Sequence, residues 1–213
     1  SELSEGDVGH PGDVVTVGAA IASAAFCDLR VFRKALVDAA LNAREDGMVA
    51  GLCPGTVEHI PSYAATWVEG VVDYVELTGD RSVLALLYGS MTRNVGALAA
   101  YLGPEGVADR AGTAYPLGWV FVDWGYVPNE GPSDMVLTMH LLNAVRSGLR
   151  WHAMLAAPQD AASHERPWPP ADAAFASVLP VSSPTEADRR RLEELETRLT
   201  VVLGRYLERC LSP

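Results

Sequence analysis

The stretch GWVFVDWG, residues 118–125, combines two indole rings and one carboxylate with an otherwise apolar run. Trp119 and Trp124 offer aromatic faces of the kind that pack on the apolar side of a sugar ring, and Asp123 offers oxygens for its hydroxyl groups. The same run has the composition of a strand buried in a core, with Asp123 capping a loop. The residues alone leave both interpretations open, a sugar platform or a filled core.

A second group of reactive side chains lies in and after a loop further upstream. Glu58 and His59 are neighbours that could form an acid–base pair, because histidine titrates near neutral pH. The alternative is that both side chains simply face water, as adjacent loop residues usually do. Trp67, on the helix that follows, is at helical spacing from Tyr63 and Tyr74. That pattern fits a core residue as well as the wall of a pocket.

Composition limits the classes of partner. The chain has 213 residues, of which 49% are hydrophobic, and a formal net charge of −11. It can therefore bury a real core, whereas its negative surface disfavours nucleic acid and anionic membranes as partners. No apolar run approaches the length of a membrane span, and the N-terminal residues lack the basic and apolar regions of a signal peptide.

The three cysteines, Cys27, Cys53 and Cys210, are far apart and show no CxxC spacing. This usage is typical of reduced thiols in a cytoplasmic protein, and it indicates neither a disulfide framework nor a zinc site. His140 and His152 lie twelve residues apart on one predicted helix, too far for a shared metal ion. We therefore expect no metal and no cofactor.

Hydrophobic periodicity predicts about six helices, in three successive pairs. Ser62 is predicted to cap the third helix and Gly79 to end it. Asp80 is predicted to cap the fourth helix, Ser133 the fifth, and Thr185 to begin the last. The predicted helices cover residues 13–27, 29–46, 63–80, 81–103, 134–157 and 185–212, with loop and strand-like residues at 104–130.

These elements divide the chain into three parts. Residues 1–157 form a helical domain, residues 158–184 a proline-rich surface crossing, and residues 185–213 an amphipathic helix that packs on the same domain. The string EDGMVAG after the second helix is echoed by PEGVADR after the fourth. Long helices in repeated hairpins, with long loops, favour an all-α fold of the α/α-toroid or solenoid type.

Four strings carry a resemblance to a known family, in matching order and spacing. They are HPGD at 10–13, AREDGMV at 43–49, IPSYAATWVEGVVDYVELTGD at 60–80 and WVFVDWG at 119–125. Together they resemble the catalytic domain of the bacterial α-L-rhamnosidases, which are six-hairpin (α/α)6 glycosidases, over roughly residues 7–155. A full toroid needs about twelve helices, so a chain with about half of them is expected to form an incomplete toroid.

The resemblance implies inverting hydrolysis of α-L-rhamnosides, in which one carboxylic acid protonates the leaving oxygen and a second carboxylate activates water. Asp7, six residues before Asp13, stands near the place of the family's general acid, and nothing here matches the later half that holds its general base. Glu58 lies on the side where the family's sugar enters and is the second catalytic candidate. The substrate-binding residues that the resemblance implies are Asp13, His59, Trp67, Trp119, Asp123 and Trp124.

Three functions remain open at this point. The first is a glycoside hydrolase-like, carbohydrate-directed protein of the α-L-rhamnosidase type, with or without hydrolytic activity, and an inverting hydrolase if it is active. The second is a repurposed half-toroid that binds or transforms a non-sugar small molecule. The third is a structural helical protein with its tryptophans in the core. An open half-toroid exposes apolar flanks, which either the proline-rich segment and the C-terminal helix or a second copy in a homodimer would cover.

Overall fold

The computed structural model of the chain describes residues 29–109, 133–158, 177–180 and 182–211. Of these described residues, 68% belong to five helices. The all-α class predicted from the sequence is therefore confirmed, and the closure of the helices into a toroid stays a prediction. The predicted first helix at 13–27 lies outside the described residues.

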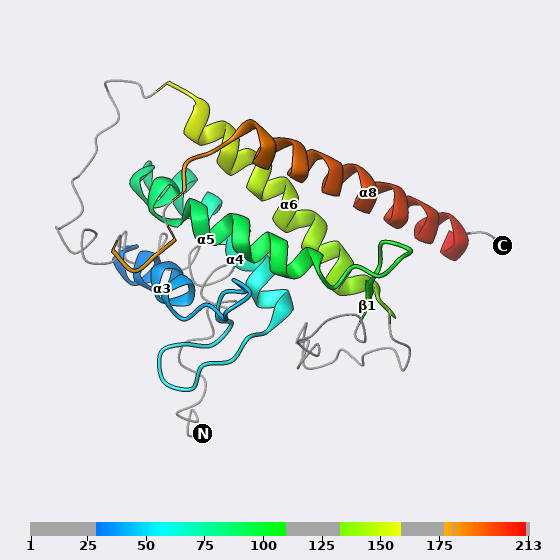
Figure 1. Ribbon diagram of the computed structural model, residues 1–213, viewed down its shortest axis with the longest axis horizontal. Helices are drawn as coiled ribbons and strands as arrows, with labels where there is room; N and C mark the ends of the chain where they lie inside the picture. Colours follow the sequence, from blue (N-terminus) through cyan, green and yellow to red (C-terminus); the bar gives the residue numbers. More distant parts are fainter. Residues whose placement is uncertain (1–28, 110–132, 159–176, 181, 212–213) are drawn as a thin grey trace.

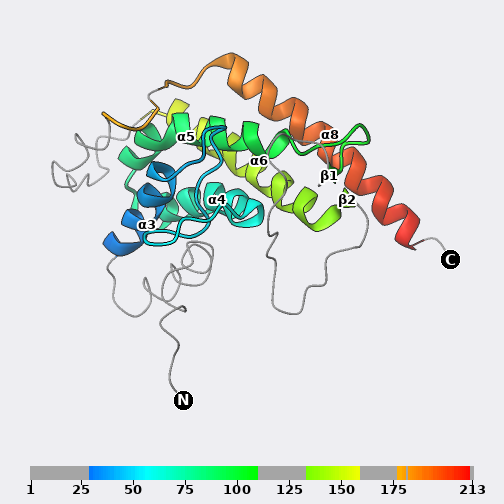
Figure 2. The ribbon, with the colours of Figure 1, turned by 60° about the horizontal axis from the view of Figure 1, so that its bottom comes forward.

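Helices and one small strand pair make up the described structure (Figure 1). The helices are α3 (Arg30–Leu41), α4 (Pro61–Thr78), α5 (Ser82–Ala99), α6 (Met135–Ala156) and α8 (Glu186–Leu211), and the strands are β1 (Ala108–Asp109) and β2 (Ser133–Asp134). α6 contacts α4, α5 and α8, while α3 packs against α4 and α5. The strands pair antiparallel near the start of α6 (Figure 2). Within the described ranges, no helix is long and apolar enough to cross a membrane.

α3 ends at Leu41, well before the end expected from its apolar pattern. Local polar groups satisfy the backbone at this point. The side-chain amide of Asn42 donates to the Asp38 carbonyl (2.9 Å), and the N–H of Gly47 donates to the Arg44 carbonyl (2.8 Å). Such side-chain and turn hydrogen bonds compete with the helical ladder, so the chain leaves the helix and enters a loop.

α4 begins at Pro61, so Ser62 lies inside the first turn and its side chain does not cap the helix, contrary to the prediction. Proline suits the first helical position because its φ is already helical and its missing N–H would have no partner there. The end of α4 is as predicted, at Gly79 in the left-handed conformation (φ 73°). Asp80 was predicted to cap α5, but Arg81 holds the N-cap position, and Asp80 accepts from the N–H of Ser82 (3.1 Å) from one residue earlier.

α6 closely matches the helix predicted at 134–157, but its cap is Asp134 rather than Ser133. Oδ1 of Asp134 accepts from the N–H of Leu137 at 2.8 Å. The backbone of Ser133 is paired with Asp109 in the strand ladder instead. The carboxylate of Asp134 has the further advantage that a negative charge is favoured at a helix N-terminus.

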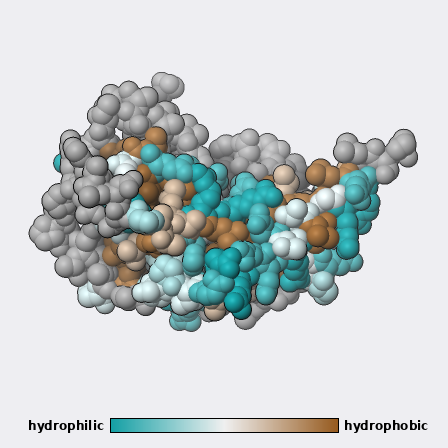
Figure 3. Space-filling model, turned by 90° about the horizontal axis from the view of Figure 1, so that it is seen from above, coloured by the Kyte–Doolittle hydropathy of each residue, from teal (hydrophilic) through white to brown (hydrophobic). Residues whose placement is uncertain are grey.

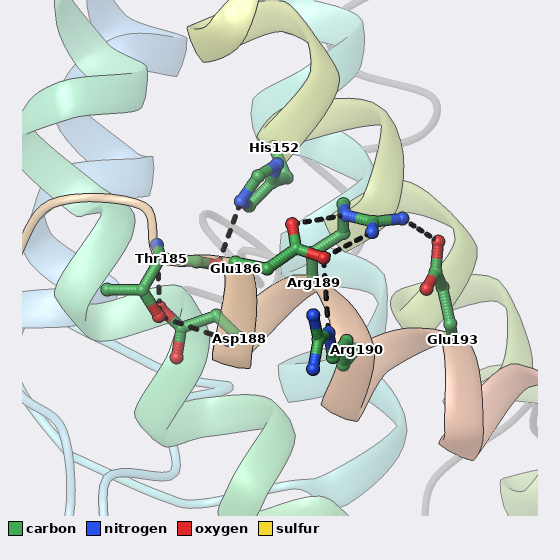
Figure 4. A network of polar contacts seen from close by, with 7 residues as sticks. All are labelled: His152, Thr185, Glu186, Asp188, Arg189, Arg190 and Glu193. Atoms are coloured by element: carbon green, nitrogen blue, oxygen red, sulfur yellow. Dashed lines mark hydrogen bonds and ion pairs between the residues drawn. The ribbon is translucent and has the colours of Figure 1, made fainter.

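α8 begins directly after Thr185, as predicted (Figure 4). The hydroxyl of Thr185 accepts from the N–H of Asp188, and the carboxylate of Asp188 accepts from the N–H of Thr185, both at 3.1 Å. This is a reciprocal cap of the helix N-terminus. On the outer face, Arg189 forms ion pairs with Glu186 and Glu193. The charge run ADRRRLEELE is therefore a solvated helix face with pairs one turn apart, as expected.

Two buried tryptophans join the central helices. Trp67 on α4 and Trp151 on α6 are 1% and 0% exposed, with ring centroids 5.9 Å apart. The indole N–H of Trp67 donates to the Leu36 carbonyl on α3 (2.9 Å), and that of Trp151 donates to the Leu84 carbonyl on α5 (3.1 Å). The pair therefore links all four of these helices through one ring contact and two hydrogen bonds.

A part-buried ion pair joins α3 to the turn between α4 and α5. Arg33 is buried, and its Nε donates to Oδ2 of Asp80 at 3.0 Å. The hydroxyl of Tyr74 donates to the same oxygen at 3.0 Å. Burial alone would raise the pKa of Asp80, but hydrogen bonds from Ser82 and from these two partners outweigh it and hold the pKa below its ordinary value. Asp80 is therefore a carboxylate at neutral pH.

Candidate functional site

Polar side chains gather where the loop of residues 42–60 meets the C-terminal end of α5. Arg44 forms a fork on Asp46, with Nε 3.0 Å from Oδ1 and Nη2 2.6 Å from Oδ2. Nη2 of Arg44 also donates to the hydroxyl of Tyr101 at 3.0 Å. Together with the two neighbouring residues predicted from the sequence, these side chains form what we call the loop cluster: Arg44, Asp46, Glu58, His59 and Tyr101.

Asp46 is held in its ionised form. Burial would raise its pKa, but hydrogen bonds from Arg44 and from the N–H of Met48 lower it, and the attraction of Arg44 and of His59 lowers it further. The net result is a pKa below the ordinary value. A general acid at neutral pH needs a raised pKa. Asp46 is therefore suited to accepting hydrogen bonds from hydroxyl groups, and is unsuited to donating a proton.

His59 is half-buried and fixed to the start of the same loop. Its Nε2 lies 3.0 Å from the carbonyl oxygen of Asn42. Because a carbonyl oxygen only accepts, Nε2 carries the proton, and Nδ1 is the acceptor of the neutral ring. The hydrogen bond thus sets the tautomer, which is the arrangement that a general base or a hydroxyl-binding histidine requires.

Glu58 is fixed through its backbone and exposed through its side chain. The N–H of Leu52 donates to the Glu58 carbonyl at 3.1 Å, and the N–H of Glu58 donates to the Leu52 carbonyl at 3.3 Å. This bridge closes residues 53–57 into a small loop. The Glu58 side chain is exposed to solvent next to His59, where a ligand can reach it.

Asn94 on α5 connects the loop to the start of α4. Its side chain is buried, with Oδ1 accepting from the N–H of Val49 (3.1 Å) and Nδ2 donating to the carbonyl of Ala64 (2.7 Å). The side-chain amide of Asn94 thus joins the segments 43–49 and 60–67. Both segments belong to strings that carry the resemblance to the α-L-rhamnosidases. Asn94 itself gives no signal in the sequence that would mark it for this position.

The sequence left two placements open for Trp67, the core or the wall of a pocket. In the structure Trp67 lies in the core. Its ring packs on Trp151 and its indole N–H is used by the Leu36 carbonyl. A sugar platform needs an aromatic face that a ligand can reach, and Trp67 is 1% exposed. These contacts favour the core interpretation, and they give the predicted substrate-binding role of Trp67 no support.

Five other predicted site residues lie outside the described residues, as does most of the predicted crossing at 158–184. They are Asp7, Asp13, Trp119, Asp123 and Trp124. Their roles, and the question raised by GWVFVDWG, therefore stay predictions. Of the predicted residues that the structure does describe, Glu58 and His59 stand together on the loop, and Trp67 lies apart from them in the core.

A row of carboxylates along α4 forms a separate feature. Burial raises the pKa of Glu69 and of Asp73, a neighbouring carboxylate raises each further, and Arg150 on α6 opposes both shifts. Glu76 forms an ion pair with Arg150. Acids of this kind suit proton donation, but Glu69 lies about 12 Å along α4 from its first residue, Pro61. The row is therefore too far from the loop cluster to act with it.

Sequence reasoning missed Arg44, Asp46 and Tyr101 as site residues. The string AREDGMV contains the first two, and an arginine followed by two acidic residues and a glycine was the available signal. Tyr101 gives no local signal, because it joins the cluster from a distant part of the chain. Over the part of the chain that the structure describes, no group of three or more His, Cys, Asp or Glu side chains is placed to hold a metal ion.

In comparisons with known proteins, no family model, no curated protein and no solved structure matches this chain. The resemblance to the α-L-rhamnosidases therefore rests on the four strings alone. The geometry of the loop cluster is independent of that resemblance, since it comes from contacts in the structure.

Proposed function

We propose that the protein is carbohydrate-directed and glycoside hydrolase-like, of the α-L-rhamnosidase type. The observation that carries the proposal is the loop cluster. It gathers a guanidinium, an ionised carboxylate and an imidazole on segments that carry the resemblance or lie beside them, and the hydroxyl of the buried Tyr101 holds the guanidinium in place. Such groups pair with the hydroxyls of a sugar ring, while aromatic faces cover its apolar side.

Binding is the minimal form of the proposal, and hydrolysis is its stronger form. Inverting hydrolysis needs two carboxyl groups about 6.5–9.5 Å apart, one of which is protonated. Glu58 is the solvent-exposed carboxylate of the loop cluster, and Asp7 is the acid that the resemblance implies. The ionised Asp46 and the fixed tautomer of His59 support binding of hydroxyls or activation of water on the same face. Asp13, Trp119, Asp123 and Trp124 complete the proposed sugar site.

Calorimetric titration of the full chain with L-rhamnose and a panel of other monosaccharides tests binding. We expect a saturable heat that is selective for rhamnose. Turnover of an aryl α-L-rhamnoside tests hydrolysis. If Glu58 is the acid or the base, Glu58→Gln lowers kcat by about 100-fold or more, the contribution typical of such a group. Glu105→Gln is the matched control, because Glu105 is also an exposed loop carboxylate but lies after α5, outside the loop cluster.

Two results would contradict this reasoning at different levels. Turnover that survives Glu58→Gln unchanged would remove Glu58 from catalysis and leave the carbohydrate proposal in place. A chain that neither binds any sugar of the panel nor cleaves the rhamnoside, while folded by circular dichroism, would reject the carbohydrate proposal itself.

A structural, self-associating helical protein is the second candidate. It is favoured by the burial of Trp67 and by the exposed apolar residues near the C-terminal end of α8. A half-toroid that acts on a non-sugar small molecule would use the same loop cluster for another ligand. A cytoplasmic location belongs to all three proposals and is supported by the free thiols of Cys53 and Cys210, since reduced cysteines are typical of that compartment.

A further inference from the structure

The C-terminal half of α8 continues beyond the N-terminal end of α6 (Figures 1 and 2). Leu192 and Leu199 are buried and mark the part of α8 that packs on the other helices. Among the described residues from 201 to 210 no side chain is buried, and from 204 onward all are exposed. We call residues 201–210 the α8 tail.

The α8 tail carries apolar side chains at its surface. Leu207 is 55% exposed and Tyr206 is 38% exposed, Cys210 is an exposed free thiol, and Leu203 is half-buried. At 100° per residue, these four side chains fall within one stripe about 100° wide. Figure 3 shows apolar side chains near this end of the molecule, set among polar ones. The stripe continues the line of the buried leucines of the same helix. Leu203 still packs partly against the core, and the other three side chains lie past the covered part.

The spacing within the stripe is symmetric about the midpoint between residues 206 and 207. In an antiparallel pair of tails centred there, Leu203 lies opposite the partner's Cys210, and Tyr206 lies opposite the partner's Leu207. Every apolar residue of one tail thus meets an apolar residue of the other, which is the self-complementarity that a two-fold interface requires. A Cβ on Gly204 would meet nothing within 4 Å, so the helix backbones have room to approach closely beside the stripe.

Charge also favours a second copy at this place. The whole chain has a net charge of −11, so two copies repel each other over most of their surfaces. The tail contains Arg205, Arg209 and Glu208, two positive charges and one negative, which gives a net charge of +1. The α8 tail projects from the rest of the molecule. Antiparallel pairing therefore keeps the acidic remainders of the two chains at opposite ends of the paired helices. Their separation there exceeds the screening length of about 8 Å at physiological salt.

We propose that the α8 tail pairs antiparallel with the α8 tail of a second copy and forms a weak homodimer. The contact involves about two and a half turns of each helix. It is therefore smaller than the interfaces of about 1,200 Å² or more that hold stable complexes, and the dimer is concentration-dependent. The inference does not depend on the carbohydrate proposal. It is tested without any sugar, so either one can fail alone.

Sedimentation velocity of the full chain, from about 5 to 500 μM, measures the pairing over the range expected of a weak complex. We expect a monomer–dimer equilibrium. Leu207→Glu places a charge in the apolar contact and raises the dissociation constant by about tenfold or more. Val201→Glu is the matched control, because Val201 is 47% exposed on the opposite side of the same helix, and it leaves the constant unchanged. A chain that is monomeric throughout, or two variants with equal effects, overturns the proposal.

A cross-link tests the register. Leu203→Cys places a thiol opposite the partner's Cys210. Diamide then oxidises the two thiols to one disulfide and is itself reduced to the hydrazine. Facing positions of two closely packed helices fall within disulfide reach, whereas the two native Cys210 thiols are offset by seven residues, about 10 Å along the pair. We expect a covalent dimer for Leu203→Cys, and none for Val201→Cys or the unmodified chain. No cross-link at concentrations where the dimer forms overturns the antiparallel register.

Discussion

Replacing Trp67 by phenylalanine separates a core tryptophan from a ligand-binding one. The indole N–H donates to the Leu36 carbonyl at 2.9 Å, and the ring packs on Trp151 with centroids 5.9 Å apart. Phenylalanine keeps an aromatic ring at this position but removes the donor and the second ring of the indole. The Leu36 carbonyl then loses its side-chain partner, and the core gains a void.

The expected loss of stability follows from these two changes. Leaving a buried carbonyl without its partner costs about 1–2 kcal/mol, and the smaller ring adds about 1–2 kcal/mol for the unfilled space. The sum is about 2–4 kcal/mol, a large part of the 5–15 kcal/mol typical of a whole domain. With a slope of about 2 kcal/mol per molar urea, the midpoint falls by about 1–2 M. Far-UV circular dichroism during urea unfolding measures it.

Trp151→Phe is the matched variant. Trp151 is also fully buried and donates to the Leu84 carbonyl at 3.1 Å, so its loss should be similar. Because the two rings touch, the double variant should lose about 0.5–1.5 kcal/mol less than the sum of the single losses. An unchanged urea midpoint for Trp67→Phe, together with weaker binding of rhamnose, would refute the core interpretation and make Trp67 a pocket wall.

Three further substitutions or conditions test the packing of the helices. Arg33→Leu leaves Asp80 without its guanidinium partner and should destabilise by about 3 kcal/mol in urea unfolding; a loss below about 1 kcal/mol would mean that water replaces the pair. Asp134→Ala removes the cap of α6 and should cost about 1 kcal/mol, with no change in helix content beyond the first turn. The native pKa values of Asp46 and Asp80 lie below those of the unfolded chain. Their stabilisation is therefore complete above about pH 4 and lost as pH falls through the native values, and a chain that gained stability as pH fell below about 4 would contradict this.

Helix ends show where a single sequence stops being sufficient. Ser62 and Ser133 are residues of the right type for a cap, yet neither holds the N-cap position of its helix. Pro61 begins α4 through its fixed φ, and Asp134 caps α6 with a charge that also suits the helix dipole. In both cases a residue one position away begins or caps the helix instead, because it has a small local advantage there. Apolar spacing locates the helix but does not resolve such a competition.

The internal echo was the better guide to backbone geometry. EDGMVAG and PEGVADR place Gly47 and Gly106 at corresponding positions, and both residues have positive φ, 102° and 82°. Each glycine N–H bonds back to the carbonyl three residues before it. The two turns follow α3 and α5 and share the same backbone geometry, and the glycines mark the places where a positive φ carries no strain.

Contacts between distant residues could not be predicted at all. Arg44 reaches Tyr101, Arg33 reaches Asp80, and Asn94 joins two segments that precede its own helix. Periodicity states which face of a helix is apolar, but it does not state which polar residue of another helix will meet an arginine or an asparagine there. Glu58 and His59 could be found because they adjoin in the sequence. Tyr101, which holds Arg44 from a distant part of the chain, could not be found in this way.

The burial of two tryptophans also determines what a fluorescence titration with rhamnose can report. Trp67 and Trp151 lie in the core, so a ligand at the surface cannot touch them, and acrylamide should quench them poorly. A saturable change in emission must then come from the other three tryptophans, Trp119, Trp124 and Trp168, of which two belong to GWVFVDWG. Loss of the change in Trp119→Phe, at an unaltered urea midpoint, would support a sugar platform in that stretch. A change that survives both Trp119→Phe and Trp124→Phe would place the ligand elsewhere.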